Sequence, residues 1–486
     1  MNPIPATDYF RILPELVLTI FGVIVMMADP LLPRRASRKP LGIVALIGAI
    51  LSSFVAIVPA AHYQGTAFFG MVNYDAFAIF FHVLIGIITV LVILASYEYL
   101  DAQHIRKGEY YGLILFGAVG MMLMSSATEL VLIFIALEIS SIASYILAGF
   151  RRRVAISSEA SVKYFLLGSF ATAFFLYGIA LMFGATGSTS VPVIAQQLRA
   201  THAPALVFVA IALMFVGLGF KLAAAPFHIW TPDVYEGAPA PIVGLMSTAP
   251  KAAVFAVLLR VFFAAASPGW FWLVWVSAAL SMTLGNIGAL RQNNIKRLLA
   301  YSSIAHAGYL LVAFLGPAEA QHQLGISAAI FYTASYAAMN VGAFCVVSHL
   351  AGAGERNVTL DDYAGLSRRQ PWLAAMLSLF LLSLIGIPAT GGFFAKFYVF
   401  NAALKANLVG ITIIGVVNSA IAAYYYLRVI VVMYMREGRE EAEVPPALPL
   451  SLQAAVALSA AATLYLGILP QRVLDYAVRS AQDLMR

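Results

Sequence analysis

The feature that most constrains this chain is a series of apolar stretches that follow one another from its first residues to its last. A helix that crosses the hydrocarbon core of a bilayer needs about 20 mostly apolar residues. Polar or Pro/Gly-rich breaks divide the chain into about fourteen such spans. The approximate spans are 10–30, 41–61, 75–98, 109–126, 128–149, 161–185, 206–230, 240–264, 270–291, 297–316, 325–350, 372–403, 408–435 and 448–470. The sequence therefore predicts an all-α integral membrane protein.

The composition agrees with this fold class and excludes others. Hydrophobic residues make up 62% of the 486 residues and charged residues only 10%, whereas a soluble domain carries about 25% charged residues. The first span lacks a basic leader and a small-residue cleavage site, so we interpret it as a retained helix. The single cysteine, Cys345, excludes an internal disulfide and a cysteine-ligated iron–sulfur cluster within this chain.

The basic residues alternate between the two sides of the predicted spans. Of the 29 lysines and arginines, seventeen lie in one set of loops, among them Arg151 and Lys296, and six lie on the opposite side. Because cytoplasmic loops carry the excess of basic residues, both termini are predicted to face away from the cytoplasm. The net charge of +7 comes mostly from these short loops, so it does not indicate nucleic-acid binding.

Two spans contain residues that interrupt a helix. The seventh runs through Lys221 into Pro226, and the twelfth contains Pro388, Gly391 and Gly392 in mid-span. Proline and paired glycines break the backbone hydrogen bonds of a helix. Corresponding interrupted helices in two halves are typical of a transport site, although proline and glycine are also common in membrane helices generally.

The spacing of the interruptions predicts an internal repeat. They are five spans apart, and a unit of five helices repeated in tandem must enter the membrane from opposite sides. We therefore predict two inverted repeats, helices 4–8 at 109–264 and helices 9–13 at 270–435, each with a broken fourth helix. Residues 1–108 then form helices 1–3, and 448–486 form helix 14 and a tail.

A few ionisable residues lie where they cannot easily reach water. Glu138 lies near the middle of a span; Lys221, Lys251 and Lys396 are deep; and Lys163 lies in the first turns of its helix. A charged side chain at the bilayer centre costs about 3 kcal/mol or more, so such residues are usually paired and functional. This census indicates a path for ions or protons.

Lysine suits proton transfer because burial moves its pKa from ~10.4 toward neutrality and a nearby carboxylate moves it back. We hypothesise that Glu138 pairs with Lys221, with Lys163 nearby, and that Lys251 and Lys396 continue a polar row along the membrane midplane. Tyr, Ser and His side chains with trapped water would fill the gaps.

Simpler readings of these residues stay open. Lys163 could reach the surface and pair with Glu159 at i,i+4. Lys396 could be an interfacial lysine, and Glu138 a structural hydrogen-bonding group between helices.

The histidines and remaining arginines are more ambiguous. His228 and His306 are further relay candidates because imidazole titrates near neutral pH, or they are packing residues. His82, Arg260 and Arg428 lie near span ends, where packing or snorkelling explains them. No histidine–carboxylate cluster has metal-ligand spacing and no phosphate-binding loop is present, so an ATP-driven or metal-dependent mechanism is not expected.

The segment from Lys221 to Pro241, KLAAAPFHIWTPDVYEGAPAP, resembles the hallmark of the antiporter-like membrane subunits of respiratory complex I. The resemblance covers almost the whole chain, from the PELVLTIFGVIVMMADPLLP opening to the last span. It is closest to the subunit N branch of bacterial NADH-quinone oxidoreductase. The features that favour this branch are the number of spans, the lack of a long C-terminal lateral helix, and Lys396 in place of a glutamate.

The resemblance implies roles for particular residues. Glu138 would be the glutamate of the fifth helix and Lys221 its partner. Lys251 would be the connecting lysine of the eighth helix, and Lys396 would occupy the proton-release position of the twelfth. The additional residues carried over to the relay are Lys163, His228 and His306.

The resemblance also implies a proton-translocating, multi-pass subunit of a bacterial inner membrane. Its partners would be the other membrane and peripheral subunits, with NADH, FMN, iron–sulfur clusters and the quinone site held by those subunits. A subunit of a multi-subunit cation/proton antiporter, which shares the fold and the lysines, is the alternative. A passive scaffold would leave the charges at mid-membrane unexplained.

Overall fold

The computed structural model describes residues 4–33, 36–58, 63–200, 205–264, 268–316, 319–438 and 448–485. Within them the fold is almost entirely helical, with one short antiparallel hairpin formed by β1 (Gly65–Ala67) and β2 (Val72–Tyr74). The helices of the first half are α1 (Ala6–Arg11), α2 (Leu13–Ala28), α3 (Lys39–Val55), α5 (Ala76–Ala102), α6 (Glu109–Ser126), α7 (Leu130–Ala148), α8 (Ala155–Thr186), α9 (Val191–Ala200), α10 (Ala205–Leu222), α11 (Trp230–Gly237) and α12 (Ala240–Ala264). Those of the second half are α13 (Pro268–Leu290), α14 (Ile295–Val312), α15 (Glu319–Leu350), α16 (Leu366–Arg369), α17 (Pro371–Ile385), α18 (Gly391–Lys405), α19 (Val409–Met435), α20 (Leu450–Ile468) and α21 (Gln471–Met485). Three short 3-10 helices are η1 (Asp29–Leu31), η2 (Ala353–Glu355) and η3 (Leu360–Tyr363).

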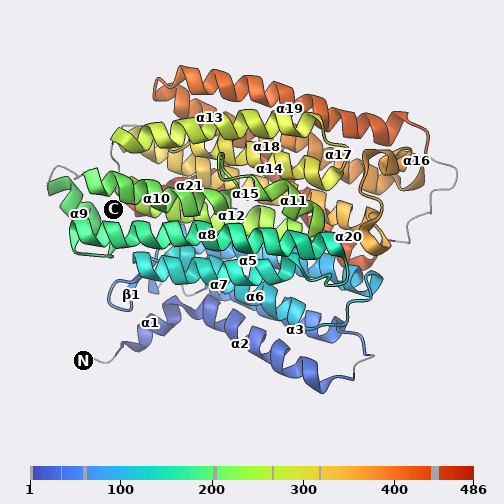
Figure 1. Ribbon diagram of the computed structural model, residues 1–486, viewed down its shortest axis with the longest axis horizontal. Coiled ribbons are helices and arrows are strands. Elements are labelled where there is room, and N and C mark those ends of the chain that lie inside the picture. Colours follow the sequence, from blue (N-terminus) through green and yellow to red (C-terminus); the bar gives the residue numbers. More distant parts are fainter. Residues whose placement is uncertain are drawn as a thin grey trace.

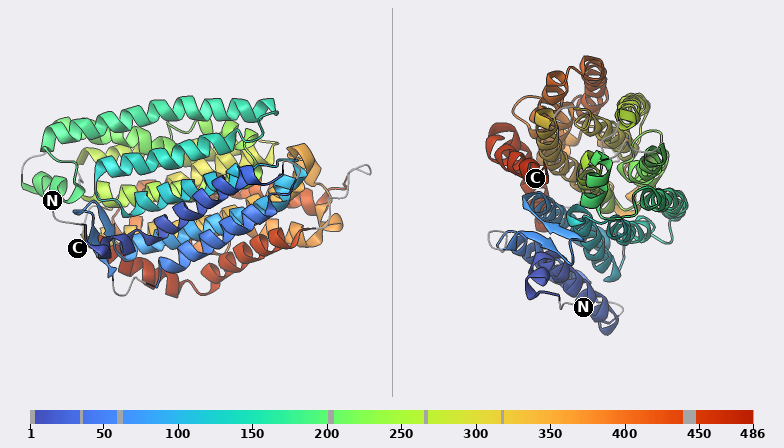
Figure 2. Two further views of the ribbon diagram at one scale, coloured as in Figure 1. Left: turned by 90° about the horizontal axis from the view of Figure 1, so that it is seen from below. Right: turned by 90° about the vertical axis from the view of Figure 1, so that its left-hand side faces the viewer.

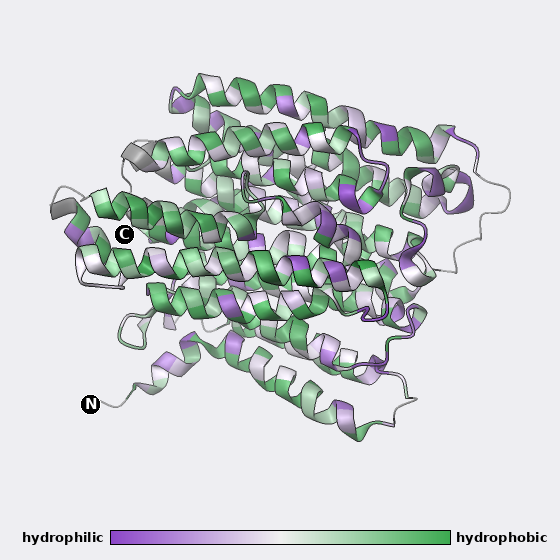
Figure 3. Ribbon diagram, viewed as in Figure 1, coloured by the Kyte–Doolittle hydropathy of each residue, from purple (hydrophilic) through white to green (hydrophobic). Residues whose placement is uncertain are grey.

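The long helices lie side by side in one bundle (Figure 1), and the end-on view in Figure 2 places the N-terminal helices at one edge of it. Ten helices among the described residues are long and apolar enough to cross a membrane, and α3 and α17 are shorter apolar helices. Hydrophobic residues dominate along the helices, and hydrophilic residues gather at the end that carries α16 (Figure 3). The predicted multi-pass, all-α class is confirmed. The number of about fourteen spans and the inverted repeats at 109–264 and 270–435 stay predictions.

Both expected helix breaks are present. In the first, α10 ends at Leu222 and α11 begins only at Trp230. In the second, α17 ends at Ile385 and α18 begins at Gly391. Gly386 follows α17 in the left-handed region, with φ of +96°, which is an ordinary way to end a helix. A Cβ at Gly392 would collide with the backbone carbonyl of Ser383, so glycine is required for α17 and α18 to approach so closely.

The two ends of the bundle differ in what they contain. The hairpin, α1 and the end of α21 lie together at one end, whereas α16 lies at the other (Figures 1 and 2). The C-terminal tail expected from the sequence is instead a helix, α21, whose Ala477 and Ala481 are buried. Its Tyr476 ring stacks on Phe80 of α5 with a centroid distance of 6.2 Å. We call the end that carries the β1–β2 hairpin the hairpin end, and the opposite end, which carries α16, the basic end.

Candidate functional site

Lys221 lies in the last turn of α10, directly before the first break, and is only 4% exposed. Its Nζ donates hydrogen bonds to the Ser141 hydroxyl at 3.0 Å and the Tyr164 hydroxyl at 3.1 Å. The expected direct pair with Glu138 is not formed: no ion pair joins them among the described residues, although the two interact electrostatically. Ser141 lies one turn after Glu138 on α7 and takes the contact in its place. The Oε1 atom of Glu138 is buried without a hydrogen-bond partner in the described part of the chain.

Lys251 lies in α12 directly after Pro250, in a segment that is buried on all sides. Its side chain is 3% exposed, and Nζ donates to the Ser303 carbonyl at 2.8 Å and to the Ser303 hydroxyl at 2.6 Å. The same hydroxyl accepts a hydrogen bond from Tyr336 at 2.8 Å. The hydroxyl of Tyr235, at the end of α11, lies close to Ser303 but outside hydrogen-bond geometry. Lys251 is thus held by a carbonyl and a hydroxyl, and not by a carboxylate.

His306 of α14 lies close enough to both Lys251 and Lys396 to interact with each of them electrostatically. It is 2% exposed, and a hydrogen bond of 2.8 Å joins its Nδ1 to the Tyr332 hydroxyl. Its ring lies 5.0 Å from that of Tyr336, which bonds the partner of Lys251. The sequence left open whether His306 belongs to the row or to the packing, and the structure places it beside residues that contact Lys251 and Lys396.

Lys396 lies in α18, just after the second break, and is 6% exposed. Nζ donates to the carbonyls of Leu384 and Ile385 at 3.0 and 2.8 Å, and to the Ser419 hydroxyl at 2.8 Å. It also lies 4.9 Å from the centre of the Tyr309 ring. The last carbonyls of α17 carry partial negative charge and favour a cation at this place. Lys396 is therefore buried within the protein.

Two expected residues lie apart from this row. The Lys163 side chain is 42% exposed and forms ion pairs of 2.7 Å with Glu159 and with Asp233 of α11. The pair with Glu159 is the one expected if Lys163 reaches the surface. His228 lies half-buried in the non-helical segment between α10 and α11, and its Nδ1 has no hydrogen-bond partner among the described residues. The structure thus brings Lys251, His306 and Lys396 together and leaves Lys163 at the surface.

A cluster of buried charges at the basic end was not foreseen. The Oε2 atom of Glu355 lies 2.7 Å from Lys296 Nζ and 3.0 Å from an Arg151 guanidinium nitrogen, and Tyr99 donates to Oε1 at 2.7 Å. Burial raises the pKa of Glu355, but Lys296 and Arg151 lower it more, so that it lies below the usual value. The sequence counted Arg151 and Lys296 as loop residues, yet they are only 6% and 0% exposed.

The same cluster fixes the corner between α11 and α12, which we call the α11–α12 corner. Lys296 donates to the carbonyls of Glu236 and Ala238 at 2.8 and 2.7 Å, where α11 ends. Glu355 accepts from the backbone N–H of Ala240 at 2.8 Å, where α12 begins. A cation thus satisfies the end of one helix and an anion the start of the next. The corner lies between the helix that carries Lys221 and the helix that carries Lys251.

Other charges are buried at the hairpin end. Arg260 was expected to snorkel, but it is 7% exposed and forms a two-pronged ion pair with Asp75 at 2.9 and 2.6 Å. Glu15 and His82, which the sequence gave no role, are buried and 3.3 Å apart. A sequence position near the end of a span does not show whether a neighbouring helix covers it.

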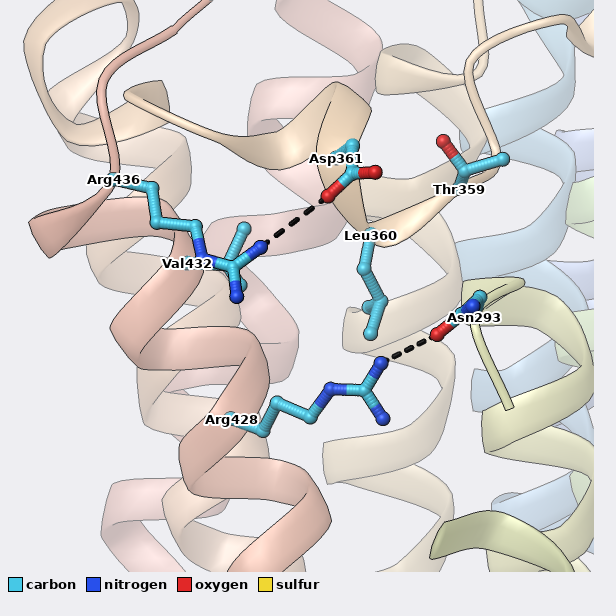
Figure 4. A pocket seen from close by; sticks show the side chains of 7 residues that line it. All are labelled: Asn293, Thr359, Leu360, Asp361, Arg428, Val432 and Arg436. Atoms are coloured by element: carbon cyan, nitrogen blue, oxygen red, sulfur yellow. Dashed lines mark hydrogen bonds and ion pairs between the residues drawn. The ribbon is translucent and has the colours of Figure 1, made fainter. Parts of the chain in front are cut away.

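A polar pocket of about 240 Å³ opens at the basic end near η3 (Figure 4). Its walls are formed by Asn293, Thr359, Leu360, Asp361, Arg428, Val432 and Arg436. Arg436 pairs with Asp361 at 3.4 Å, and none of the row lysines line it. Among the described residues, no group of three or more His, Cys, Asp or Glu side chains could hold a metal ion.

Comparison with known proteins decides the family. Residues 127–422 match the family described as "NADH:quinone oxidoreductase/Mrp antiporter, TM". The chain is 66% identical to "NADH-quinone oxidoreductase subunit N 2" of Koribacter versatilis, with 99% of each chain covered. It is 49% identical to "NADH-quinone oxidoreductase subunit N 1" of Solibacter usitatus over 98% of each chain. The chain belongs to the subunit N family of NADH-quinone oxidoreductase.

Solved structures agree with this family. A chain of respiratory complex I from Thermus thermophilus with bound aureothin matches with a TM-score of 0.80 and 36% identity, over 95% of this chain and 98% of that one. A chain of the Mrp complex from a Dietzia species matches with a TM-score of 0.81 and 22% identity, over 97% of each chain. The second likeness shows a shared fold alone. The expected antiporter-like membrane subunit of the complex I kind is confirmed.

Proposed function

We propose that this chain translocates protons as a membrane-arm subunit of NADH-quinone oxidoreductase. It would work with the other membrane and peripheral subunits, which would hold NADH, FMN, the iron–sulfur clusters and quinone. The chain would lie in a bacterial inner membrane, with both of its termini on the non-cytoplasmic side. One observation carries the proposal: Lys221, Lys251 and Lys396 are all buried and contact hydroxyls or carbonyls.

The neutral partners suit a lysine that must gain and lose a proton. A lysine paired with a buried carboxylate cannot lose its proton without leaving an unpaired anion in a dry site. A lysine held by the Ser303 hydroxyl and carbonyl becomes a neutral amine that can still hydrogen-bond to that hydroxyl. The proton can therefore leave Lys251 without stranding a charge.

The second half of the row supports transfer between Lys251 and Lys396. From Lys251 the contacts run through Ser303 and Tyr336 to the ring of His306. His306 lies 5.6 Å from the ring of Tyr309, which covers Lys396. Tyrosine and serine hydroxyls both donate and accept hydrogen bonds, so they can pass a proton on, and ordered water is the usual partner where side chains do not reach.

Glu138 would control the first lysine. It lies one turn from Ser141, which holds Lys221, and acts on Lys221 electrostatically without an ion pair. A carboxylate favours the charged form of a nearby lysine. Redox energy released in other subunits would change the separation between Glu138 and Lys221. The resulting change in the charge of Lys221 would pass to Lys251 and Lys396.

The test is Lys251→Met in the assembled complex in liposomes, with NADH oxidation and proton release measured together. We expect fewer protons released per NADH oxidised, because methionine fills the site but carries no proton. Ser378→Ala serves as the control, since within the described part of the chain that buried hydroxyl bonds the Ala374 carbonyl of its own helix and none of the three lysines. An unchanged ratio in Lys251→Met with normal assembly would contradict the proposed relay.

The antiporter alternative predicts another result. In that case the purified chain and its partners would acidify or alkalinise liposomes in response to a sodium gradient, without NADH or quinone. We expect no such response, and we expect the chain to co-purify with subunits that absorb as flavin and iron–sulfur centres.

A further inference from the structure

Glu15 and His82 form a buried acid–base pair that the proposed row of lysines does not use. Glu15 lies in the first turn of α2 and is 3% exposed, and His82 of α5 is 0% exposed. Nε2 of His82 lies 3.3 Å from Oε1 of Glu15 and 3.1 Å from the Met122 carbonyl. Neither carboxylate oxygen accepts a hydrogen bond from the described residues.

The pair can hold one exchangeable proton, because Nε2 of His82 donates to the Met122 carbonyl while Nδ1 has no hydrogen-bond partner among the described residues. An ionised carboxylate in a dry site needs donors, and among the described residues the cationic partner within ion-pair distance of Glu15 is His82. The pair therefore has two forms of equal charge, a carboxylate with an imidazolium or a carboxylic acid with a neutral imidazole. Addition of one proton makes the pair +1, and removal of one makes it −1.

Other titratable groups surround the pair. They are Tyr74 of β2, Asp75 before α5, Arg260 of α12 and Tyr476 of α21. Asp75 and Arg260 neutralise each other in their two-pronged contact. The nearby ends of α3 and α6 contribute Ser52, Ser125 and backbone carbonyls among the described residues. Among the described residues, Asp75 and Arg260 therefore add no net charge to the surroundings of the pair.

Contacts through α6 connect the Glu15–His82 pair to α12, the helix that carries Lys251. Met122 accepts from His82, and Ser125, one turn later in α6, accepts a 2.7 Å hydrogen bond from Arg260. Arg260 follows Lys251 by nine residues on α12, which is about 13.5 Å along the axis. The pair thus lies between the row of lysines and the hairpin end, opposite to the basic end.

We propose that Glu15 and His82 are a second proton-exchange site, which takes up a proton from the Lys251 side and releases it to water at the hairpin end. The proton adds to the free base of the pair and later leaves from the acid. No bond between heavy atoms changes and no electron moves. The inference rests on the proposed proton translocation.

The experiment uses the assembled complex in liposomes and compares wild type, Glu15→Gln, His82→Gln and Lys251→Met. Glutamine preserves the shape of Glu15 and a donor to Met122 in place of His82, but neither amide exchanges a proton. We expect both variants to release fewer protons per NADH oxidised while NADH oxidation persists. Infrared difference spectra on reduction should lose a deuterium-sensitive carboxylic-acid band in Glu15→Gln.

Thr19→Val is the matched control, because among the described residues the Thr19 hydroxyl bonds the backbone carbonyl of Glu15, at 2.8 Å, and not its carboxylate. A wild-type proton ratio with an unchanged infrared band in Glu15→Gln would overturn the inference, and so would failure of both glutamine variants to assemble. If Lys251→Met lowers the ratio and Glu15→Gln does not, the relay stands and only this site fails. If neither lowers it, the proposed function itself fails.

Discussion

Two lysines of neighbouring helices are both buried but have different partners. Lys251 of α12 is 3% exposed and contacts the carbonyl and hydroxyl of Ser303. Lys296 of α14 is 0% exposed and lies 2.7 Å from the Glu355 carboxylate, with two backbone carbonyls completing its contacts. Burial alone therefore does not identify a proton-carrying lysine.

The difference in partner separates a fixed charge from a changeable one. Loss of the Lys296 proton would leave Arg151 as the one cation paired with Glu355 among the described residues, and the carbonyls of Glu236 and Ala238 would lose their charged donor. Such a fully bonded cation is a structural element. Lys251 has no carboxylate partner among the described residues, so its charge depends on proton supply.

The largest expected effect is on stability at the α11–α12 corner. Lys296→Met should destabilise the folded chain by roughly 3–5 kcal/mol, because removal of one partner of a buried pair leaves the other uncompensated. Lys251→Met should leave the unfolding temperature unchanged or raise it, since methionine replaces a charge that no anion balances. Thermal unfolding of the two solubilised variants measures this difference. Equal losses of stability in the two variants would contradict the proposed difference between Lys296 and Lys251.

A double variant sharpens the same point. Lys296→Met with Glu355→Gln should lose less stability than the sum of the single losses, by ~0.5–3 kcal/mol, because residues in direct contact couple. Ser303→Ala with Lys251→Met lacks a charge pair and serves as the comparison. Strict additivity at Lys296 and Glu355 would mean that the two residues act separately.

A smaller effect concerns the stability of the folded chain at acidic pH. The pKa of Glu355 lies below its usual 4.5 because Lys296 and Arg151 outweigh burial. Its contribution to stability is therefore fully present above about pH 4.5 and is lost as the pH falls through the lowered value. The gap in unfolding temperature between wild type and Glu355→Gln should narrow below pH 4.5. A gap that stays constant with pH would show that charge is not what Glu355 supplies.

The sequence predicted the membrane class, the two helix breaks and the burial of Lys221, Lys251 and Lys396, because apolar length and proline are local properties of the chain. It could not predict that Ser141 replaces Glu138 as the contact of Lys221. It also could not predict that Lys296, Arg151 and Arg260 are covered by other helices. These depend on which loops and helices meet in three dimensions, and Glu355 lies far in sequence from Arg151 and Tyr99. From the sequence alone, charged residues in loops are interpreted as solvent-exposed, because the helices that cover them cannot be identified.

The smallest expected effect is at Lys163, which has carboxylate partners like Lys296 but is exposed. Its side chain is 42% exposed, and its ion pairs with Glu159 and Asp233 face water and are screened. Lys163→Gln should therefore leave the unfolding temperature unchanged, and the number of protons released per NADH should also stay the same. Lys163→Arg is the charge-keeping control. A fall in the proton ratio in Lys163→Gln that Lys163→Arg restores would place this lysine in the relay after all, and would show that exposure does not exclude a lysine from proton transfer.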